Sequence, residues 1–205
     1  MENKSIIFLS KLWARRALAA SCKILNFCYL RSLGNESVLS FRSTSLDNKL
    51  FLILHDIRSA YNVGAIFRTA DGSGVSKIYL SGYTPAPAED DKLAKSRADK
   101  MIEKTALGAE QSVSWEKCDD LGKLLESLKE ENFSIVALEK NDDSIDIRKY
   151  DKKFPMAIIL GNEVDGVDQS VLEKCDAVVS IPMRGKKESL NVSVAAGIAM
   201  YEMLS

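Results

Sequence analysis

Short apolar runs alternate with segments of helical periodicity along most of the chain, and this alternation constrains the fold more than any other feature. Strands that alternate with helices form a mostly parallel sheet covered by helices on both faces, so we predict an α/β fold. A charged stretch at 89–104 is expected to be a helix or a loop. The expected strands are 50–56, 77–82, 112–116, 133–139, 155–161 and 177–182, and the expected helices are 61–74, 119–132 and 189–205.

The 205-residue chain is expected to divide into a basic N-terminal extension, 1–48, and one globular domain, 49–205. Residues 3–35 carry six Lys and Arg side chains and no acidic side chain, and residues 34–49 are polar and rich in serine, as in a linker. Three interpretations of the extension stay open. They are an RNA-contacting arm, an organellar targeting peptide, and an extension without a specific function.

The composition excludes several classes of protein. Lys and Arg number 28 against 29 Asp and Glu, so any RNA or DNA contact must come from local patches rather than a global basic field. No apolar run reaches the ~18 residues of a membrane span. The four cysteines lack CxxC spacing and His55 is the single histidine, so we expect no metal site, reduced and mostly buried thiols, and a cytoplasmic protein unless the extension is a targeting peptide. His55 is expected to be structural, with a catalytic base as the alternative.

The segment DIRSAYNVGAIFRTADGSGV, 56–75, follows the first expected strand. Parallel sheets bind ligands in loops beyond the carboxyl ends of their strands, so this segment is a candidate site. Asn62 is expected to cap the helix. Val63 and Ile66 belong to its buried stripe, and Arg68 lies about 140° from Val63, off that stripe. Arg68 is therefore free to face a cleft, with a solvated arginine as the alternative.

A second candidate loop contains Gly161, Asn162 and Glu163, directly after an apolar strand. A glycine-containing turn exposes backbone N–H groups that suit contact with adenosine or phosphate. Glu163 has a second interpretation, as a carboxylate that complements the dipole of a following helix. No P-loop, HExxH or GxSxG motif is present, so the chemistry should need neither a metal nor a nucleophilic Ser or Cys.

The third candidate segment, IPMRGKKESLNVSVAAGIAMYE at 181–202, joins a basic loop to a helix that is apolar almost all round and must be buried. Ser189 is expected to cap this helix. Asn191 lacks a structural explanation in the sequence, so we expect it to serve a site.

Together these segments resemble the motifs of the SpoU (TrmH-like) branch of the SPOUT RNA methyltransferases. The matching residues are 62–75, 159–167 and 181–202, with 104–113 similar to an intermediate loop of the family. The resemblance implies a C-terminal trefoil knot in the α/β domain, S-adenosylmethionine bound in the knot, a homodimer, and methylation of a ribose 2′-OH in tRNA or rRNA.

The resemblance also implies roles for individual residues. Arg68 would be the catalytic arginine, acting with an RNA phosphate to orient the 2′-OH or accept its proton. The other residues of the catalytic motifs would be Asn62, Glu163, Ser189 and Asn191. The cofactor would contact Leu138, Leu160, Gly161, Asn162, Ile181, Met183 and Leu190.

Local basic patches are the candidate RNA contacts: Arg184, Lys186 and Lys187 in the third segment, and Arg97 in the charged stretch. Two alternatives to an RNA methyltransferase stay open. One is a non-catalytic RNA-binding protein that retains the fold. The other is an α/β nucleotide-binding module for another ligand, which the absence of a phosphate-loop motif disfavours.

Overall fold

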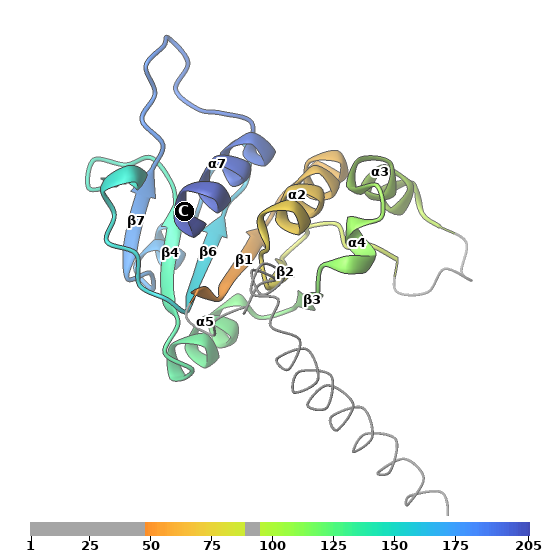
Figure 1. The fold of residues 1–205 in the computed structure, drawn as a ribbon, viewed down its shortest axis with the longest axis horizontal. Coiled ribbons are helices and arrows are strands. Elements are labelled where there is room, and N and C mark those ends of the chain that lie inside the picture. The colour runs from red at the N-terminus through yellow and green to blue at the C-terminus, as the bar shows by residue number, and fades with distance from the viewer. Residues whose placement is uncertain (1–47, 89–94) are drawn as a thin grey trace, which may run out of the picture. The chain divides into compact units, whose positions relative to one another are not determined.

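The computed structural model of the protein describes residues 48–88 and 95–205. Within these ranges seven strands form one sheet in the order β3-β2-β1-β6-β4-β7-β5, and every neighbouring pair is parallel (Figure 1). The predicted α/β class is confirmed, and the N-terminal extension lies almost wholly outside the described residues. The strands are β1 (Leu50–His55), β2 (Lys77–Ser81), β3 (Trp115–Cys118), β4 (Ser134–Leu138), β5 (Ile145–Asp146), β6 (Met156–Leu160) and β7 (Ala177–Ser180).

Helices cover the sheet on both faces. In the part of the chain described, they are α2 (Ala60–Ser73), α3 (Arg97–Ala106), α4 (Ala109–Ser112), α5 (Leu121–Glu130), α6 (Gln169–Leu172) and α7 (Val192–Leu204), with a 3₁₀ turn at Ile147–Lys149. Figure 1 shows α2 between α7 and α3 on one side of the sheet. None of the described helices is long and apolar enough to cross a membrane.

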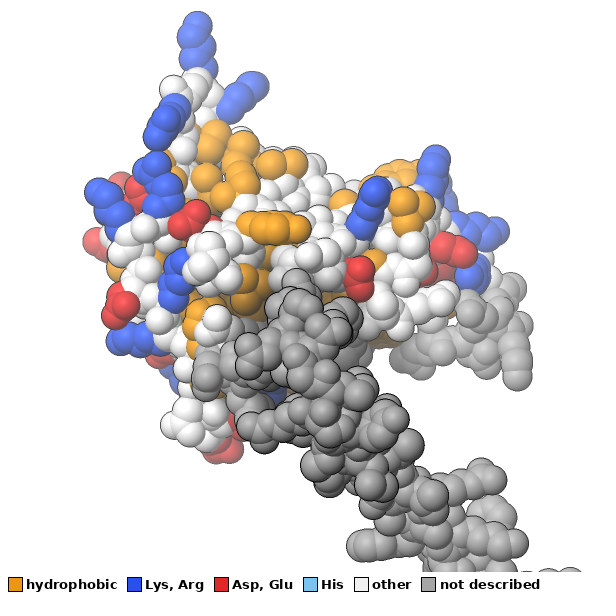
Figure 2. Space-filling view, viewed as in Figure 1, with side chains coloured by type: hydrophobic (Ala, Val, Ile, Leu, Met, Phe, Trp, Pro, Cys, Tyr) orange, Lys and Arg blue, Asp and Glu red, His pale blue; other side chains and the backbone are white. Residues whose placement is uncertain are grey.

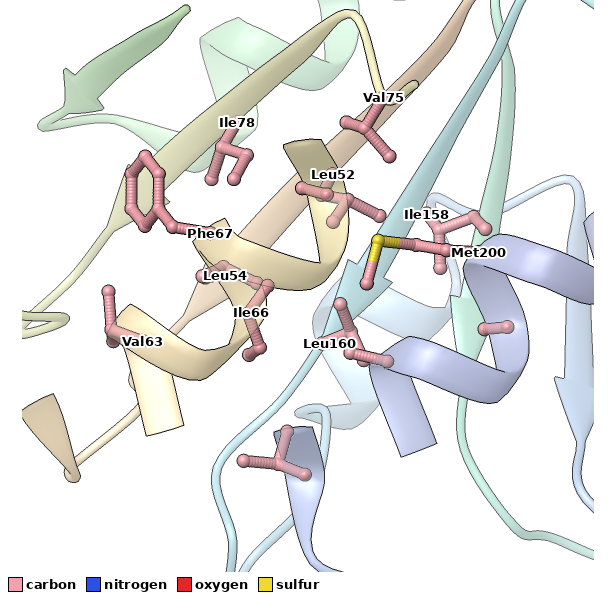
Figure 3. Close-up of a cluster of buried hydrophobic side chains, with 14 of the residues drawn as sticks. Leu52, Leu54, Val63, Ile66, Phe67, Val75, Ile78, Ile158, Leu160 and Met200 are labelled. Carbon is pink, nitrogen blue, oxygen red and sulfur yellow. The ribbon is translucent and has the colours of Figure 1, made fainter. Parts of the chain in front are cut away.

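The pleat of β1 explains the two layers, because successive side chains of a strand point to opposite faces. Leu52 and Leu54 are buried in a cluster with residues of α2, β6 and α7 (Figure 3). Phe51 and Ile53 are buried on the opposite face, in a second cluster that includes Leu125 of α5. The first five positions of the strand are therefore all apolar, as expected for a strand covered on both sides.

The cap of α2 differs from the prediction. Asn62 does not cap the helix: the N-cap is Ser59, whose hydroxyl accepts a hydrogen bond from the backbone N of Asn62 at 3.3 Å. Both residue types favour caps, and the helix begins at the earlier one. The helix ends at Gly74, whose φ of 84° is the left-handed conformation that glycine adopts readily. The side-chain amide of Asn62 is therefore free for other contacts.

The third expected strand and the last helix also begin later than predicted. Residues 109–112 form the short helix α4, so β3 covers 115–118 instead of 112–116. The last helix begins at Val192, and its N-cap is Asn191 rather than Ser189. The Asn191 Oδ1 accepts from the backbone N of Ser193 at 2.9 Å, so Asn191 has the structural explanation that the sequence did not reveal.

Because the sheet is parallel, the carboxyl ends of β1, β4, β6 and β7 lie at one edge. The loops that follow these four strands carry most of the residues singled out in the sequence. The trefoil knot stays a prediction.

Candidate functional site: a pocket at the carboxyl ends of the strands

A pocket opens where β4, β6 and β7 end, and its walls come from the loops after these strands and from the start of α7. Every residue predicted to contact the cofactor lines it. These are Leu138, Leu160, Gly161, Asn162, Ile181, Met183 and Leu190. Residues from four separated segments therefore surround one space, as the resemblance implies.

The turn that forms one wall depends on Gly161. A Cβ atom built at Gly161 would overlap the Gly166 carbonyl and lie 2.6 Å from the backbone N of Val167. Asn162 and Gly166 exchange two backbone hydrogen bonds of 3.0 Å each, which close the turn. Only glycine lets the strand end and the returning chain approach so closely.

Glu163 ties this turn to the start of α2. Its carboxylate accepts hydrogen bonds from the backbone N of Arg58 at 3.0 Å, the backbone N of Ser59 at 3.3 Å and Asn62 Nδ2 at 2.9 Å. Partial desolvation opposes ionisation, but these donors outweigh it, and the pKa of Glu163 is lowered from its ordinary value. Glu163 therefore holds two loops together as a carboxylate.

Asn62 extends this connection to α7. Its Oδ1 accepts a hydrogen bond from Asn191 Nδ2 at 3.2 Å, while its own Nδ2 donates to Glu163. One residue from each candidate loop thus joins a single hydrogen-bonded chain, Glu163–Asn62–Asn191. Ser189 lines the same pocket as Glu163. These four residues are the ones predicted to accompany the arginine.

Arg68 does not line this pocket. It is exposed on α2 and lines a separate hollow together with Thr69, Lys104, Thr105 and Tyr201. The prediction that it lies off the buried stripe is confirmed. Within one chain, however, the guanidinium faces a different space from the one that the cofactor residues surround.

The pocket carries an acidic lining. Four carboxylates, those of Glu139, Glu163, Asp165 and Glu188, line it against one ammonium group, that of Lys140. Such a lining favours a ligand with positive charge and disfavours a phosphate group. The remaining walls include Leu138, Leu160 and Ile181, which suit a flat apolar group.

The residues proposed for RNA contact fall into two places. Arg184, Lys186 and Lys187 are exposed in the loop between β7 and α7, and Figure 2 shows Lys and Arg side chains at the tip of this loop. The same loop supplies Met183 to the pocket. Arg97 is exposed at the start of α3, on the far side of α2 from this loop (Figure 1).

Glu139 is a pocket residue that the sequence reasoning missed. It follows β4 directly, and its Oε2 accepts from the backbone N of Val167 at 2.9 Å while Oε1 accepts from the backbone N of Lys140 at 2.8 Å. An acidic residue immediately after an apolar strand was the available signal, because such residues lie at the ligand-binding edge of a parallel sheet.

The described cysteines, Cys118 and Cys175, and His55 do not line the pocket. Cys118 and Cys175 are free and half-buried, Cys22 and Cys28 lie outside the described residues, and no metal-binding group of His, Cys, Asp and Glu occurs in the described ranges. Burial raises the pKa of the Cys175 thiol to about 11. His55 Nδ1 lies 2.8 Å from the buried Ser81 Oγ, so its hydrogen bonding is structural.

Fold and site together define an α/β protein with an acidic, partly apolar pocket at the carboxyl ends of its parallel strands. The chain belongs to the SpoU rRNA Methylase family, whose model matches residues 49–201.

A curated relative is the TrmH family tRNA/rRNA methyltransferase of Staphylococcus saprophyticus. It is 35% identical over 152 residues, a match that covers 74% of this chain and 57% of the relative. The chain thus spans little more than half the length of that protein.

Solved structures show the same fold. An AdoMet-bound rRNA methyltransferase from Sinorhizobium meliloti aligns with a TM-score of 0.67 and 25% identity, covering 77% of this chain and 56% of that chain. The TrmH/SpoU tRNA modifying enzyme of A. aeolicus aligns with a TM-score of 0.63 and 32% identity, covering 78% and 77%. A structure described as an RNA 2′-O ribose methyltransferase aligns with a TM-score of 0.65 and 25% identity, covering 77% and 56%.

Proposed function

We propose that this protein transfers a methyl group from S-adenosylmethionine to a ribose 2′-OH of tRNA or rRNA. One observation carries the proposal: the seven residues predicted to hold the cofactor line one pocket, and the chain Glu163–Asn62–Asn191 lies at that pocket. Membership of the SpoU family supports it, and so do the descriptions of the relatives as AdoMet-bound, tRNA- or rRNA-directed and 2′-O-specific.

The residues of the pocket fit S-adenosylmethionine. Leu138, Leu160 and Ile181 provide apolar walls for adenine, and the turn after Gly161 brings backbone groups close to them. The excess of carboxylates suits a molecule that carries a sulfonium and an ammonium group. When bound, this cofactor supplies an activated methyl group with its own leaving group, so the protein need only position the acceptor and assist loss of its proton.

Glu163, Asn62 and Asn191 are positioning residues in this proposal. Their hydrogen bonds fix the loop before α2, the turn after β6 and the start of α7 relative to one another. Ser189, exposed on the same wall, holds the RNA phosphate or the arginine. The wall that faces the target ribose is thereby ordered before RNA arrives.

Arg68 acts on the RNA from a second copy of the chain. It is exposed in a hollow separate from the cofactor pocket, so one chain alone does not bring the two together. Paired with an RNA phosphate, its guanidinium orients and acidifies the 2′-OH, or it first passes a proton to that phosphate and then accepts the proton of the 2′-OH as a neutral guanidine. A homodimer that places α2 of one protomer near the pocket of its partner completes the site.

The exposed face of α7 supports a homodimer. Val194, Ile198 and Tyr201 are spaced by four and three residues, so they share one face, and all three are exposed although the opposite face of α7 is already buried. Figure 2 shows exposed apolar side chains in this region. Tyr201 also lines the hollow that holds Arg68, so a partner packed on α7 would lie directly beside the guanidinium.

Three measurements test the proposal. Calorimetric titration with S-adenosylmethionine should give one site per chain, and transfer of a labelled methyl group to total tRNA and rRNA should yield a 2′-O-methylated nucleoside on digestion. Cofactor binding without transfer to any RNA would favour a non-catalytic RNA-binding protein. Light scattering on the same sample should give twice the chain mass of 22.7 kDa.

A further inference from the structure

We infer that Tyr83 is a positioning residue of the cofactor pocket, because its hydroxyl fixes the buried side chain of Asn162 and Asn162 in turn holds the pocket wall at 162–166. Tyr83 follows β2, does not line the pocket and belongs to none of the three candidate segments. For its effect on the cofactor, the inference rests on the proposed function.

Asn162 is the centre of this arrangement. Only 8% of the residue is exposed, and every polar atom of its side chain is used. Its Oδ1 accepts from the backbone N of Val164 at 2.7 Å and of Asp165 at 3.1 Å, and its Nδ2 hydrogen-bonds the Tyr83 hydroxyl and donates to the Asp56 carbonyl at 3.1 Å. The hydrogen bonds that Oδ1 accepts hold the backbone of the pocket wall. The hydrogen bonds of Nδ2 fix the position of the side chain and therefore of Oδ1.

The backbone around Tyr83 is itself fixed. Its N–H donates to Asp56 Oδ1 at 3.0 Å, and Asp56 has a φ of 56°, a left-handed conformation that is uncommon for residues other than glycine. Gly82 also has a positive φ, of 62°, and a Cβ atom there would collide with the Asp56 carboxylate. Next in the chain, the buried Thr84 donates from Oγ1 to the Leu54 carbonyl at 2.9 Å.

These contacts place the Tyr83 hydroxyl before any ligand arrives. Tyr83 is 55% exposed, so burial does not explain its position, whereas the hydrogen bonds of its backbone N–H and its hydroxyl do. Asp56 has an uncommon backbone conformation, and Gly82 has no room for a side chain. The surrounding structure stabilises both residues and so holds this loop in place. The loop after β2 thereby fixes the position of the turn at 162–166, after β6.

Arg58 is the other neighbour of the Tyr83 hydroxyl. A side-chain hydrogen bond with Tyr83 is the main reason that the pKa of Arg58 is raised, and Arg58 also lies 3.8 Å from Asp165. Arg58 could therefore influence the same turn without Asn162. The experiment must separate these two routes.

The backbone N–H groups of Val164 and Asp165 donate to Asn162 Oδ1, so their hydrogen-exchange rates in the ligand-free protein report directly on how firmly Asn162 is held. In Tyr83→Phe, which keeps the ring, both amides should exchange faster by roughly 2- to 12-fold, the range that corresponds to one typical net hydrogen bond. In an Asn162→Ala background, Tyr83→Phe should cause no further change. An unchanged rate in the single variant, or an equal increase in the Asn162→Ala background, would overturn the inference.

Two control variants complete the design. Tyr150→Phe removes a hydroxyl that lies 3.3 Å from Ser134 Oγ, at the amino end of β4 and so on the side of the sheet away from the pocket. This variant should leave the exchange rates of both amides unchanged. Arg58→Leu keeps the contact between Tyr83 and Asn162, and should also leave them unchanged. If Arg58→Leu reproduced the effect of Tyr83→Phe, the link would run through Arg58 and the inference would be wrong.

Calorimetry connects the turn to the cofactor. Tyr83→Phe should raise the Kd for S-adenosylmethionine by a factor similar to its effect on exchange, and Tyr150→Phe should not. Faster exchange with an unchanged Kd would overturn the positioning role. If the wild-type protein bound no S-adenosylmethionine at all, the proposed function would fail, whereas the exchange rates would still decide whether Tyr83 holds the turn.

Discussion

Asn62 Nδ2 donates a hydrogen bond to Glu163 Oε1 across 2.9 Å, although 101 residues separate the two in the sequence. Two backbone N–H groups before α2, those of Arg58 and Ser59, reach the same carboxylate. A single side chain therefore sets the position of α2 relative to the turn that walls the pocket.

Replacement of Glu163 should loosen this connection. Glu163→Gln keeps the size of the side chain but removes the charge that strengthens three hydrogen bonds, so the Kd for S-adenosylmethionine should rise by roughly 10-fold. Asp165→Asn is the matched control. Asp165 also lines the pocket, but its ion pair, with Arg58, is long and exposed, so calorimetry should show a much smaller effect.

The pKa of Glu163 predicts a pH dependence. Because its pKa is lowered in the folded protein, its contribution to stability is fully present above its ordinary pKa and is lost as the pH falls through the lowered value. Denaturation measured across this acid range should therefore show a smaller acid-induced loss of stability for Glu163→Gln than for the wild-type protein. Equal losses in the two proteins would contradict this role.

Gly161 and Gly185 offer a comparison of two loop glycines. Gly161→Ala would force a Cβ atom into the Gly166 carbonyl, so it should distort the turn, lower the midpoint of thermal unfolding and abolish measurable cofactor binding. Gly185 lies in the basic loop with no atom within 4 Å of a built Cβ, so Gly185→Ala should leave both properties unchanged. Similar behaviour of the two variants would mean that the turn at Gly161 adapts.

Gly64 allows the close contact between α2 and α3. A Cβ atom there would overlap the Ile102 carbonyl and the Thr105 hydroxyl and lie 3.0 Å from Ile102 Cα. Gly64→Ala should therefore destabilise the fold by about 1–3 kcal/mol in chemical denaturation, as overpacking does. Gly72→Ala, later in the same helix, has 3.7 Å to its nearest neighbour and should be neutral or slightly stabilising.

The sheet and most of the pocket were predictable from the sequence, because short apolar runs such as 156–160 have the length typical of buried strands and parallel strands end on one side of the sheet. The caps were not. Ser59 and Asn62 both favour an N-cap and lie three residues apart, and only the chain's entry into α2 decides between them.

The contacts between loops could not be predicted from the sequence either. Nothing in the local pattern indicates that Glu163 reaches Asn62, or that Tyr83 reaches Asn162, because these pairings depend on the order of the strands. Periodicity placed Arg68 off the buried stripe of α2 but not in a hollow of its own. Which space the guanidinium faces depends on tertiary packing and, in our proposal, on a second chain.

The most direct test of the account compares wild-type protein with Arg68→Ala in cofactor binding and in 2′-O-methyl transfer to RNA. Because Arg68 lies outside the pocket, the variant should bind S-adenosylmethionine with an unchanged Kd and lose methyl transfer by roughly 100-fold or more, as expected when a positioned acid–base group is removed. Full transfer by Arg68→Ala, or loss of cofactor binding in that variant, would contradict the account.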